Sequence, residues 1–170
     1  MDYAALIKEV GRGARGARDL TRAQAENLFG AMLDGVVPDL ELGALLIALR
    51  VKGESADEVA GFLAAMQART TPMAAPEGPR TVLLPSFNGA RKQANLMPLV
   101  ASLLARAGVP VLIFGRHDFD SRVSPFELLA ALGLPTSDTL AEAEQRLRTD
   151  RLAVLPLQTL NPGMDALMRS

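Results

Sequence analysis

Apolar residues follow two different patterns in the two parts of this chain. Through about residue 70 they recur every three or four positions, which is the spacing of the buried face of an α-helix. Tyr3, Leu6 and Val10 begin this pattern, and glycines at positions 11, 13 and 16 interrupt it. The pattern predicts four short helices that pack as a bundle, over residues 2–10, 21–34 and 38–50 and from residue 55 onward.

Helix-start signals support these elements. Thr21, with Gln24 three residues later, forms the sequence pattern of a capping box. Pro38 suits the first turn of a helix, where its missing N–H is not needed. Ser55 is a favoured N-cap residue, and the acidic residues that follow it oppose the helix dipole.

Beyond the bundle the pattern changes. Residues 71–80 contain three prolines and predict a hinge or linker without regular structure. The run over residues 109–114 is β-branched and continuously apolar, as in a strand that is buried on both faces. The expected elements are strands over residues 81–84, 109–114 and 151–157 and helices over residues 96–107, 126–132 and 140–148.

Strands that alternate with helices predict a parallel sheet with crossover helices, so the fold class is α/β. We expect a helical N-terminal domain over residues 1–70, a linker over residues 71–80 and a partial α/β domain over residues 81–170. Three strands make a thin parallel sheet, and both faces of such a sheet need cover. We therefore expect the chain to be a fragment or natural truncation of a longer protein.

The composition excludes several kinds of site. The 170 residues include no cysteine and one histidine, which excludes disulfides, thiolate nucleophiles, cysteine zinc sites and histidine-rich metal sites. A net charge of −1 gives no global attraction to nucleic acid, so any basic site is local. Without a signal-peptide pattern or a long apolar run, we expect a cytoplasmic protein with no membrane partner. An aromatic content of 4% argues against base stacking as the main means of binding.

One segment of the bundle resembles a known family. Residues 48–55 read Ala-Leu-Arg-Val-Lys-Gly-Glu-Ser, and an acidic helix that contains Ala60 and Gly61 follows them. This resembles the N-terminal helical domain of glycosyltransferase family 3, which contains anthranilate phosphoribosyltransferase and the pyrimidine nucleoside phosphorylases. The resemblance implies that the helical domain pairs two chains into a homodimer and precedes a nucleoside phosphorylase/phosphoribosyltransferase-like α/β domain.

The phosphate motifs of that family are altered here. Its phosphoribosyltransferases carry Gly-Thr-Gly-Gly-Asp after the first strand and Asn-Ile-Ser-Thr at the next helix. Here residues 85–89 read Pro-Ser-Phe-Asn-Gly and residues 95–98 read Asn-Leu-Met-Pro. Phe87 stands in the place of a glycine, and Met97 and Pro98 replace both hydroxyl residues. The resemblance therefore implies that the pyrophosphate cradle is lost.

The string over residues 85–96 is instead similar to a divergent, YbiB-type branch of the family. That similarity implies nucleic-acid binding without sequence specificity and without transferase activity, with no catalytic residue, cofactor or metal. The partner would be DNA, single- or double-stranded, or RNA. The predicted nucleic-acid and phosphate-binding residues are Ser86, Asn88, Gly89, Arg91, Lys92, Asn95, Arg116 and Arg122.

Each of these assignments has an alternative. Arg91 and Lys92 suit a phosphate clamp, or form a solvated loop pair. Asn88 with Gly89 suits an anion site, or forms a tight turn. His117, beside Asp118 and Asp120, suits a metal ligand or a general base, or has a structural or surface role, which the weak spacing favours. The glycine-rich basic run either extends a nucleic-acid surface or is a solvated connector, and it contains Arg12, Arg15, Arg18 and Arg22.

Two other functions compete with nucleic-acid binding. The first is a phosphoribosyltransferase with an altered acceptor, for which the ligands would be phosphoribosyl diphosphate and magnesium. The fold and Asn95 support this alternative, whereas Phe87, Met97 and Pro98 oppose it. The second is a dimerisation module, since the helical part retains the family pattern.

Overall fold

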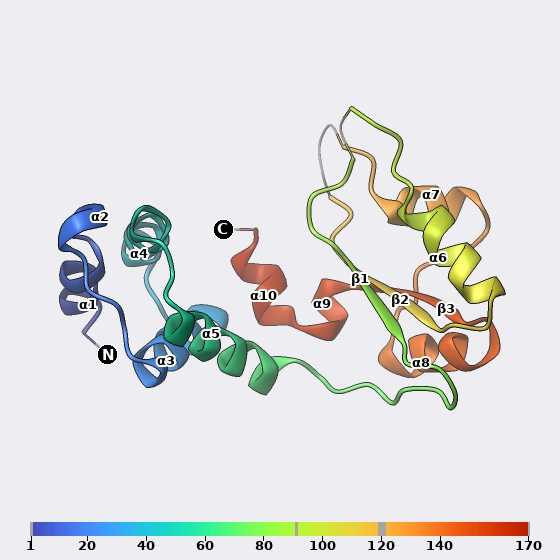
Figure 1. The fold of residues 1–170 in the computed structure, drawn as a ribbon, viewed down its shortest axis with the longest axis horizontal. Coiled ribbons are helices and arrows are strands. Elements are labelled where there is room, and N and C mark those ends of the chain that lie inside the picture. Colours follow the sequence, from blue (N-terminus) through green and yellow to red (C-terminus); the bar gives the residue numbers. More distant parts are fainter. Residues whose placement is uncertain (1, 91, 119–121, 170) are drawn as a thin grey trace. The chain divides into compact units, whose positions relative to one another are not determined.

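The computed structural model describes residues 2–90, 92–118 and 122–169, without the side chains of residues 14 and 15. The chain forms two compact units, Met1–Thr70 with Ala166–Ser170, and Thr71–Asp165. Each unit has its own apolar core, and Figure 1 shows the ribbon of the chain. No helix within the described residues is long and apolar enough to cross a membrane.

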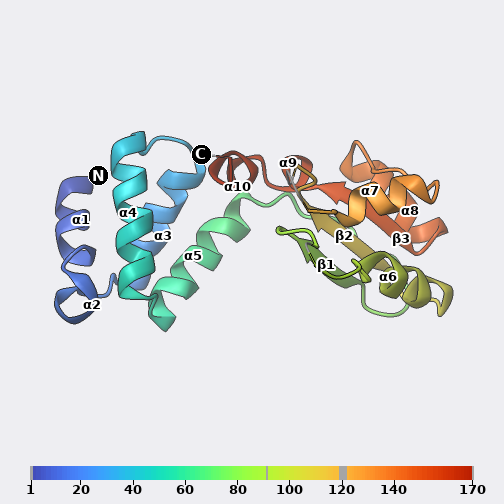
Figure 2. The same cartoon turned by 90° about the horizontal axis from the view of Figure 1, so that it is seen from above.

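The first unit contains the four predicted helices and one more. Gly13–Gly16 forms a short additional helix in the glycine-rich run, where the weak helix propensity of glycine predicts none. Helix α1 packs along α4, and α3 packs along α5 (Figure 2). The helices are α1 Tyr3–Val10, α2 Gly13–Gly16, α3 Arg22–Leu33, α4 Asp39–Lys52 and α5 Ala56–Arg69.

Both predicted caps of the bundle are present. The Thr21 hydroxyl accepts a hydrogen bond from the backbone N–H of Gln24, whose side chain accepts one from the Thr21 N–H. Ser55 and Glu58 make the same reciprocal pair at the start of α5. These bonds satisfy amide groups that a helix start otherwise leaves unpaired.

A buried ion pair joins the start of α5 to the rest of the bundle. The Lys52 ammonium donates to Glu58 Oε2 and to Asp19 Oδ1, each at 2.7 Å, and the side chains of Lys52 and Glu58 are 5% and 0% exposed. Glu58 also accepts from the backbone N–H of Leu20 at 2.9 Å and of Ser55 at 2.7 Å. Burial by itself raises the pKa of Glu58, but the hydrogen bonds from Lys52, Ser55 and Leu20 outweigh it and lower that pKa.

The second unit is a three-stranded parallel sheet covered by helices, which confirms the predicted α/β class. The strands are β1 Val82–Ser86, β2 Val111–Gly115 and β3 Leu152–Pro156, in the order β1-β2-β3. Helices α6 and α7 cover one face of the sheet, and α8 covers the other (Figure 1). The helices are α6 Met97–Arg106, α7 Pro125–Ala131, α8 Leu140–Thr149, α9 Leu157–Leu160 and α10 Pro162–Leu167, and the last residues of α10 belong to the first unit.

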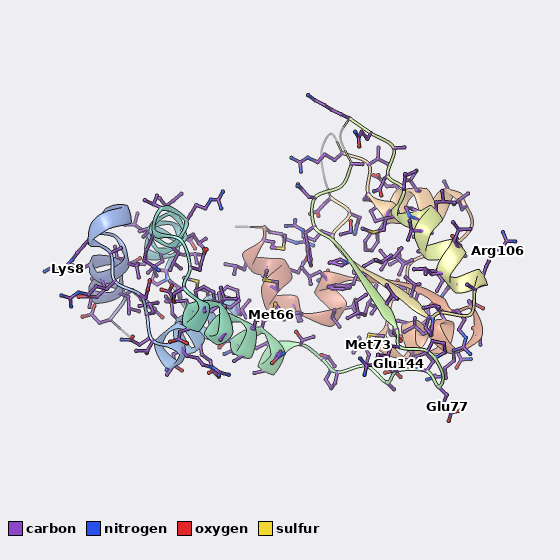
Figure 3. All side chains as sticks on the ribbon, in the orientation of Figure 1. Lys8, Met66, Met73, Glu77, Arg106 and Glu144 are labelled. Carbon is purple, nitrogen blue, oxygen red and sulfur yellow. The ribbon has the colours of Figure 1, made fainter. Side chains whose placement is uncertain are left out.

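The proline-rich segment 71–80 has no regular structure but is attached to the second unit. The backbone N–H of Ala74 donates to Glu144 Oε1 on α8 at 2.7 Å, and Met73 packs against the core beside α8 (Figure 3). The Arg151 guanidinium donates to the carbonyl of Glu77 at 3.2 Å. The division between the two units therefore falls at Thr70, before the prolines.

We expect Gly61→Ala to destabilise the helical bundle by about 1–3 kcal/mol, because overpacking of a close helix contact forces neighbouring atoms apart. A Cβ at Gly61 would meet the carbonyl oxygen of Arg22 and would lie 2.8 Å from the Glu26 nitrogen. Gly43 on α4 is the matched control, since a Cβ there has no atom within 4 Å. Gly43→Ala should stabilise by about 0.5–1 kcal/mol through helix propensity. Denaturant unfolding, monitored by circular dichroism, gives the free energy of unfolding of both variants. Equal changes for Gly61→Ala and Gly43→Ala would contradict the close packing at Gly61.

We expect Glu58→Gln to lower the free energy of unfolding by about 3 kcal/mol near pH 7, because it leaves Lys52 buried with one fewer charged partner. Since the folded pKa of Glu58 lies below its ordinary value of 4.5, its contribution is complete above pH 4.5 and is lost as pH falls through the folded pKa. The difference between parent and variant should therefore shrink in acid. Urea titrations from pH 3 to 7 test this expectation. Glu54→Gln, at an exposed residue, should change the free energy of unfolding little at any pH. A difference between the parent and Glu58→Gln that stays the same from pH 3 to 7 would contradict the expected pH dependence.

Candidate functional site

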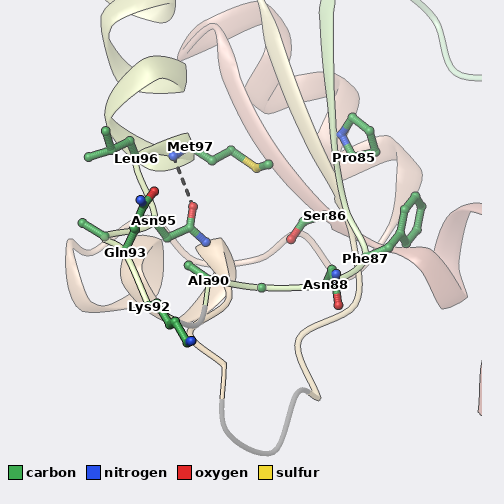
Figure 4. A pocket seen from close by; sticks show the side chains of 12 residues that line it. Pro85, Ser86, Phe87, Asn88, Ala90, Lys92, Gln93, Asn95, Leu96 and Met97 are labelled. Carbon is green, nitrogen blue, oxygen red and sulfur yellow. Dashed lines mark hydrogen bonds between the residues drawn. The ribbon is translucent and has the colours of Figure 1, made fainter.

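The candidate site lies at the carboxyl ends of strands β1 and β2, where parallel sheets commonly bind ligands. An open hollow there is lined by residues 85–90 and 92–97, which connect β1 to α6 (Figure 4). The Ser86 side chain points into this hollow toward Asn95 (Figure 4). We call this feature the β1–α6 hollow.

Backbone hydrogen bonds hold two loops together beside the hollow. Ala90 and Val123 form an antiparallel bridge in which each N–H donates to the other residue's carbonyl at 2.9 Å. The side-chain nitrogen Nδ2 of Asn95 also donates to the Val123 carbonyl at 3.1 Å. The loop that leads to α6 and the loop that leads to α7 are therefore neighbours in the structure.

Gly115 allows the ends of β1 and β2 to approach closely. Its φ is +148°, and a Cβ there would lie 2.6 Å from the Ser86 carbonyl carbon. The following residue, Arg116, donates its backbone N–H to the Ser86 carbonyl at 2.9 Å. A side chain at position 115 would push Ser86 and the loop after it away from β2.

The start of α6 has few amide groups left for an anion. Asn95 Oδ1 accepts from the backbone N–H of Met97 at 3.2 Å, the dashed line in Figure 4. Pro98, the second residue of the helix, has no N–H to donate. Two of the groups that make a helix N-terminus an anion site are thus occupied or missing.

Five of the eight predicted site residues line the hollow. Ser86 is buried at the end of β1, and Lys92 is exposed on the loop that leads to α6. Gly89 has a φ of +54°, a left-handed conformation that suits a turn after Asn88. The residues that line the hollow are Ser86, Asn88, Gly89, Lys92 and Asn95.

The two predicted arginines of the second loop have protein partners. Arg116 forms a bidentate ion pair with Asp118, at 3.0 and 2.6 Å, and lies 3.8 Å from Asp165. The hydrogen bonds to Asp118 raise the pKa of the Arg116 guanidinium, and its side chain is 12% exposed. Arg122 donates to the carbonyl of Asn88 at 2.9 Å and so supports the loop that bounds the hollow.

The other candidates lie elsewhere. Arg91 is outside the described residues, as is the side chain of Arg15. Arg12 and Arg18 each lie 3.9 Å from Glu9 in the first unit. His117 is exposed and lies against Phe126, with ring centroids 5.7 Å apart.

Sequence reasoning missed two features of the site. The first is the Ala90–Val123 bridge, which is made of backbone groups and leaves no residue signature. The second is a capping box at α7, in which Ser124 and Glu127 exchange hydrogen bonds at 3.0 and 3.2 Å. A Ser-x-x-Glu pattern was the available signal for it. Within the described part of the chain, no cluster of three or more histidine, aspartate or glutamate side chains offers a metal site.

A helical bundle followed by a parallel α/β unit is the fold of anthranilate phosphoribosyltransferases. The enzyme from Thermus thermophilus superposes with a TM-score of 0.78 at 24% identity, over 99% of this chain and 50% of that one. Residues 4–70 match the helical bundle domain of the glycosyl transferase family. The chain therefore belongs to glycosyltransferase family 3, among the anthranilate phosphoribosyltransferase-like proteins.

Curated relatives place the chain within this family more closely. It is 43% identical to YbiB of Escherichia coli (strain K12) over 166 residues, which are 97% of this chain and 52% of YbiB. It is 31% identical to the anthranilate phosphoribosyltransferase of Rhodopseudomonas palustris (strain BisA53), over 96% of this chain and 47% of the enzyme. The chain spans about half the length of these relatives.

Proposed function

We propose that this chain binds nucleic acid without sequence specificity, through phosphate contacts in the β1–α6 hollow, and has no transferase activity. The observation that supports this proposal is the replacement of a phosphoribosyltransferase cradle by a hollow with different donors. Phe87 replaces a cradle glycine, while Lys92 and Asn88 bring an ammonium group and an amide. The similarity of residues 85–96 to the YbiB-type branch points in the same direction.

The donors of the hollow suit a phosphodiester better than a pyrophosphate with its metal ion. A pyrophosphate cradle depends on several backbone N–H groups that converge on one anion. Here Asn95 occupies the N–H of Met97, and Pro98 has none. The remaining side-chain donors, such as Lys92, would contact one phosphate each. Contacts of this kind position a nucleic-acid backbone and read no sequence.

The charge distribution predicts moderate affinity that falls as the salt concentration rises. With a net charge of −1, the chain as a whole does not attract a polyanion. Attraction would come from the exposed ammonium group of Lys92 at the hollow. Arg116 contributes little to it, because Asp118 and Asp165 offset its charge. When binding depends on such phosphate contacts, the logarithm of the affinity falls linearly with the logarithm of the salt concentration.

We expect Lys92→Glu to weaken binding of a labelled single-stranded oligonucleotide about tenfold, equally for different sequences, and to reduce the salt slope by about one. Arg80→Glu is the matched control, because it makes the same charge change at an exposed residue before β1. Fluorescence anisotropy at two salt concentrations measures both. Equal binding by parent and Lys92→Glu would show that the hollow is not the site.

The transferase alternative is tested on the same samples. Calorimetric titration with phosphoribosyl diphosphate and magnesium should give no saturable heat. Clear saturable binding, together with no affinity for the oligonucleotide at low salt, would replace the nucleic-acid proposal by the enzyme.

A homodimer is a second proposed property, and an exposed apolar face on α4 favours it. Leu40, Ile47 and Val51 are 84%, 66% and 56% exposed, and their spacing of seven and four residues places them on one side of the helix. A second copy of this chain would bury the same face twice around a two-fold axis.

We expect the double variant Leu40→Lys, Ile47→Lys to be monomeric at concentrations where the parent has twice the monomer mass, because lysines would place like charges across the axis. Both residues are exposed, so folding stability should change by less than about 0.5 kcal/mol each. Light scattering after size exclusion measures the mass. Leu132→Lys, at a residue 68% exposed after α7, is the control. A parent that is monomeric at micromolar concentration would rule out this dimer.

A further inference from the structure

Phe87 is an exposed aromatic residue at the edge of the candidate site. It directly follows β1, is 36% exposed and belongs to the lining of the β1–α6 hollow. The Phe114 ring lies beside it, with centroids 5.9 Å apart and planes at 79°. This edge-to-face contact holds the Phe87 ring in place and leaves part of it open to solvent.

The ring and the polar groups lie on different sides of the strand end. Figure 4 shows Phe87 pointing away from the side on which Ser86 faces Asn95. The ring therefore flanks the hollow instead of filling it. The loop between the ring and the helix carries Asn88 and Lys92, so an apolar face and phosphate donors are only a few residues apart. A nucleotide has the same two parts, an apolar base face and an anionic phosphate.

Other aromatic residues of the described chain are placed differently. Phe29 and Phe62 pack against each other in the first unit, with centroids 5.1 Å apart. Phe126 is a buried residue of α7. Phe114 belongs to β2 and lies beside Phe87. Phe87 is thus the aromatic side chain that the described structure places at the hollow.

We propose that Phe87 is a stacking platform for one unpaired base, so that the hollow prefers single-stranded nucleic acid to duplex. This inference rests on the proposed function and assigns its ligand class. Stacking on an aromatic ring is tolerant of sequence, because every base has a π-face. The bases of a duplex are already stacked, and exposing one requires unstacking it. A single ring gives a modest preference, in agreement with the low aromatic content of the chain.

The test compares three labelled probes of equal length by fluorescence anisotropy at low salt: a single-stranded oligothymidine, an abasic strand with the same phosphates, and a duplex. Phe87→Ala and Phe87→Leu should each weaken oligothymidine binding about tenfold and leave abasic and duplex binding within about twofold. Leu keeps apolar bulk without a π-face, so it separates stacking from packing. Leu83→Ala, at a residue 58% exposed in β1, is the control and should change none of the three.

A direct readout is available because the chain has no tryptophan. Phe87→Trp introduces a single indole, which should retain oligothymidine binding and lose emission when the base stacks on it. The abasic strand should bind without this quenching.

The outcomes separate the two proposals. If the parent binds all three probes with equal affinity and the Phe87 variants change none of them, stacking is wrong and phosphate binding stands. If the variants weaken all three probes equally, Phe87 has a packing role in the loop and the platform is again wrong. If the parent binds no probe at low salt, the proposed function fails and the inference fails with it.

Discussion

The helical unit depends on one buried charge, the ammonium group of Lys52. An unpaired ammonium in an apolar core is strongly unfavourable, so Lys52 requires Glu58 and Asp19 where the structure places them. Glu58 in turn binds the backbone of Leu20, before α3, and of Ser55, before α5. The network therefore fixes the starts of both helices, whose contact at Gly61 leaves no room for a side chain. Its value lies in orientation more than in net stability, since buried pairs often offset little more than their desolvation.

The order and type of the main elements follow from apolar spacing and capping residues, but strand ends do not. The apolar run predicted β1 over residues 81–84, whereas the strand extends to Ser86 because Pro85 and Ser86 continue the register with β2. Proline is tolerated there since β1 lies at the edge of the sheet. Gly13–Gly16 forms a helix despite poor propensity. The extension of β1 arises from its pairing with β2, and α2 contacts α4. The local sequence encodes neither contact.

The site also contains residues that one local segment places together and residues whose roles depend on distant contacts. Residues near one another in sequence, such as Ser86, Asn88 and Lys92, line one hollow because a single loop carries them. Residues that depend on distant partners were harder to assign. Arg116 reads as a phosphate ligand in sequence, yet its ion pairs include Asp165, far along the chain. Motif reasoning identifies the loop, but it does not identify which charges remain available to a ligand.

The altered cradle has a physical consequence that connects fold and function. Backbone amides at a helix start bind a phosphate at a fixed point and at fixed angles, as catalysis on that phosphate requires. In this chain Pro98 and the Asn95–Met97 hydrogen bond leave fewer free backbone amides at the start of α6, and in the proposed function side chains would donate to the phosphates instead. Side chains such as Lys92 tolerate many phosphate positions, which suits a repeating backbone better than a reacting group. Gly115 still holds β1 against β2, so the scaffold of the site persists while its donors have changed.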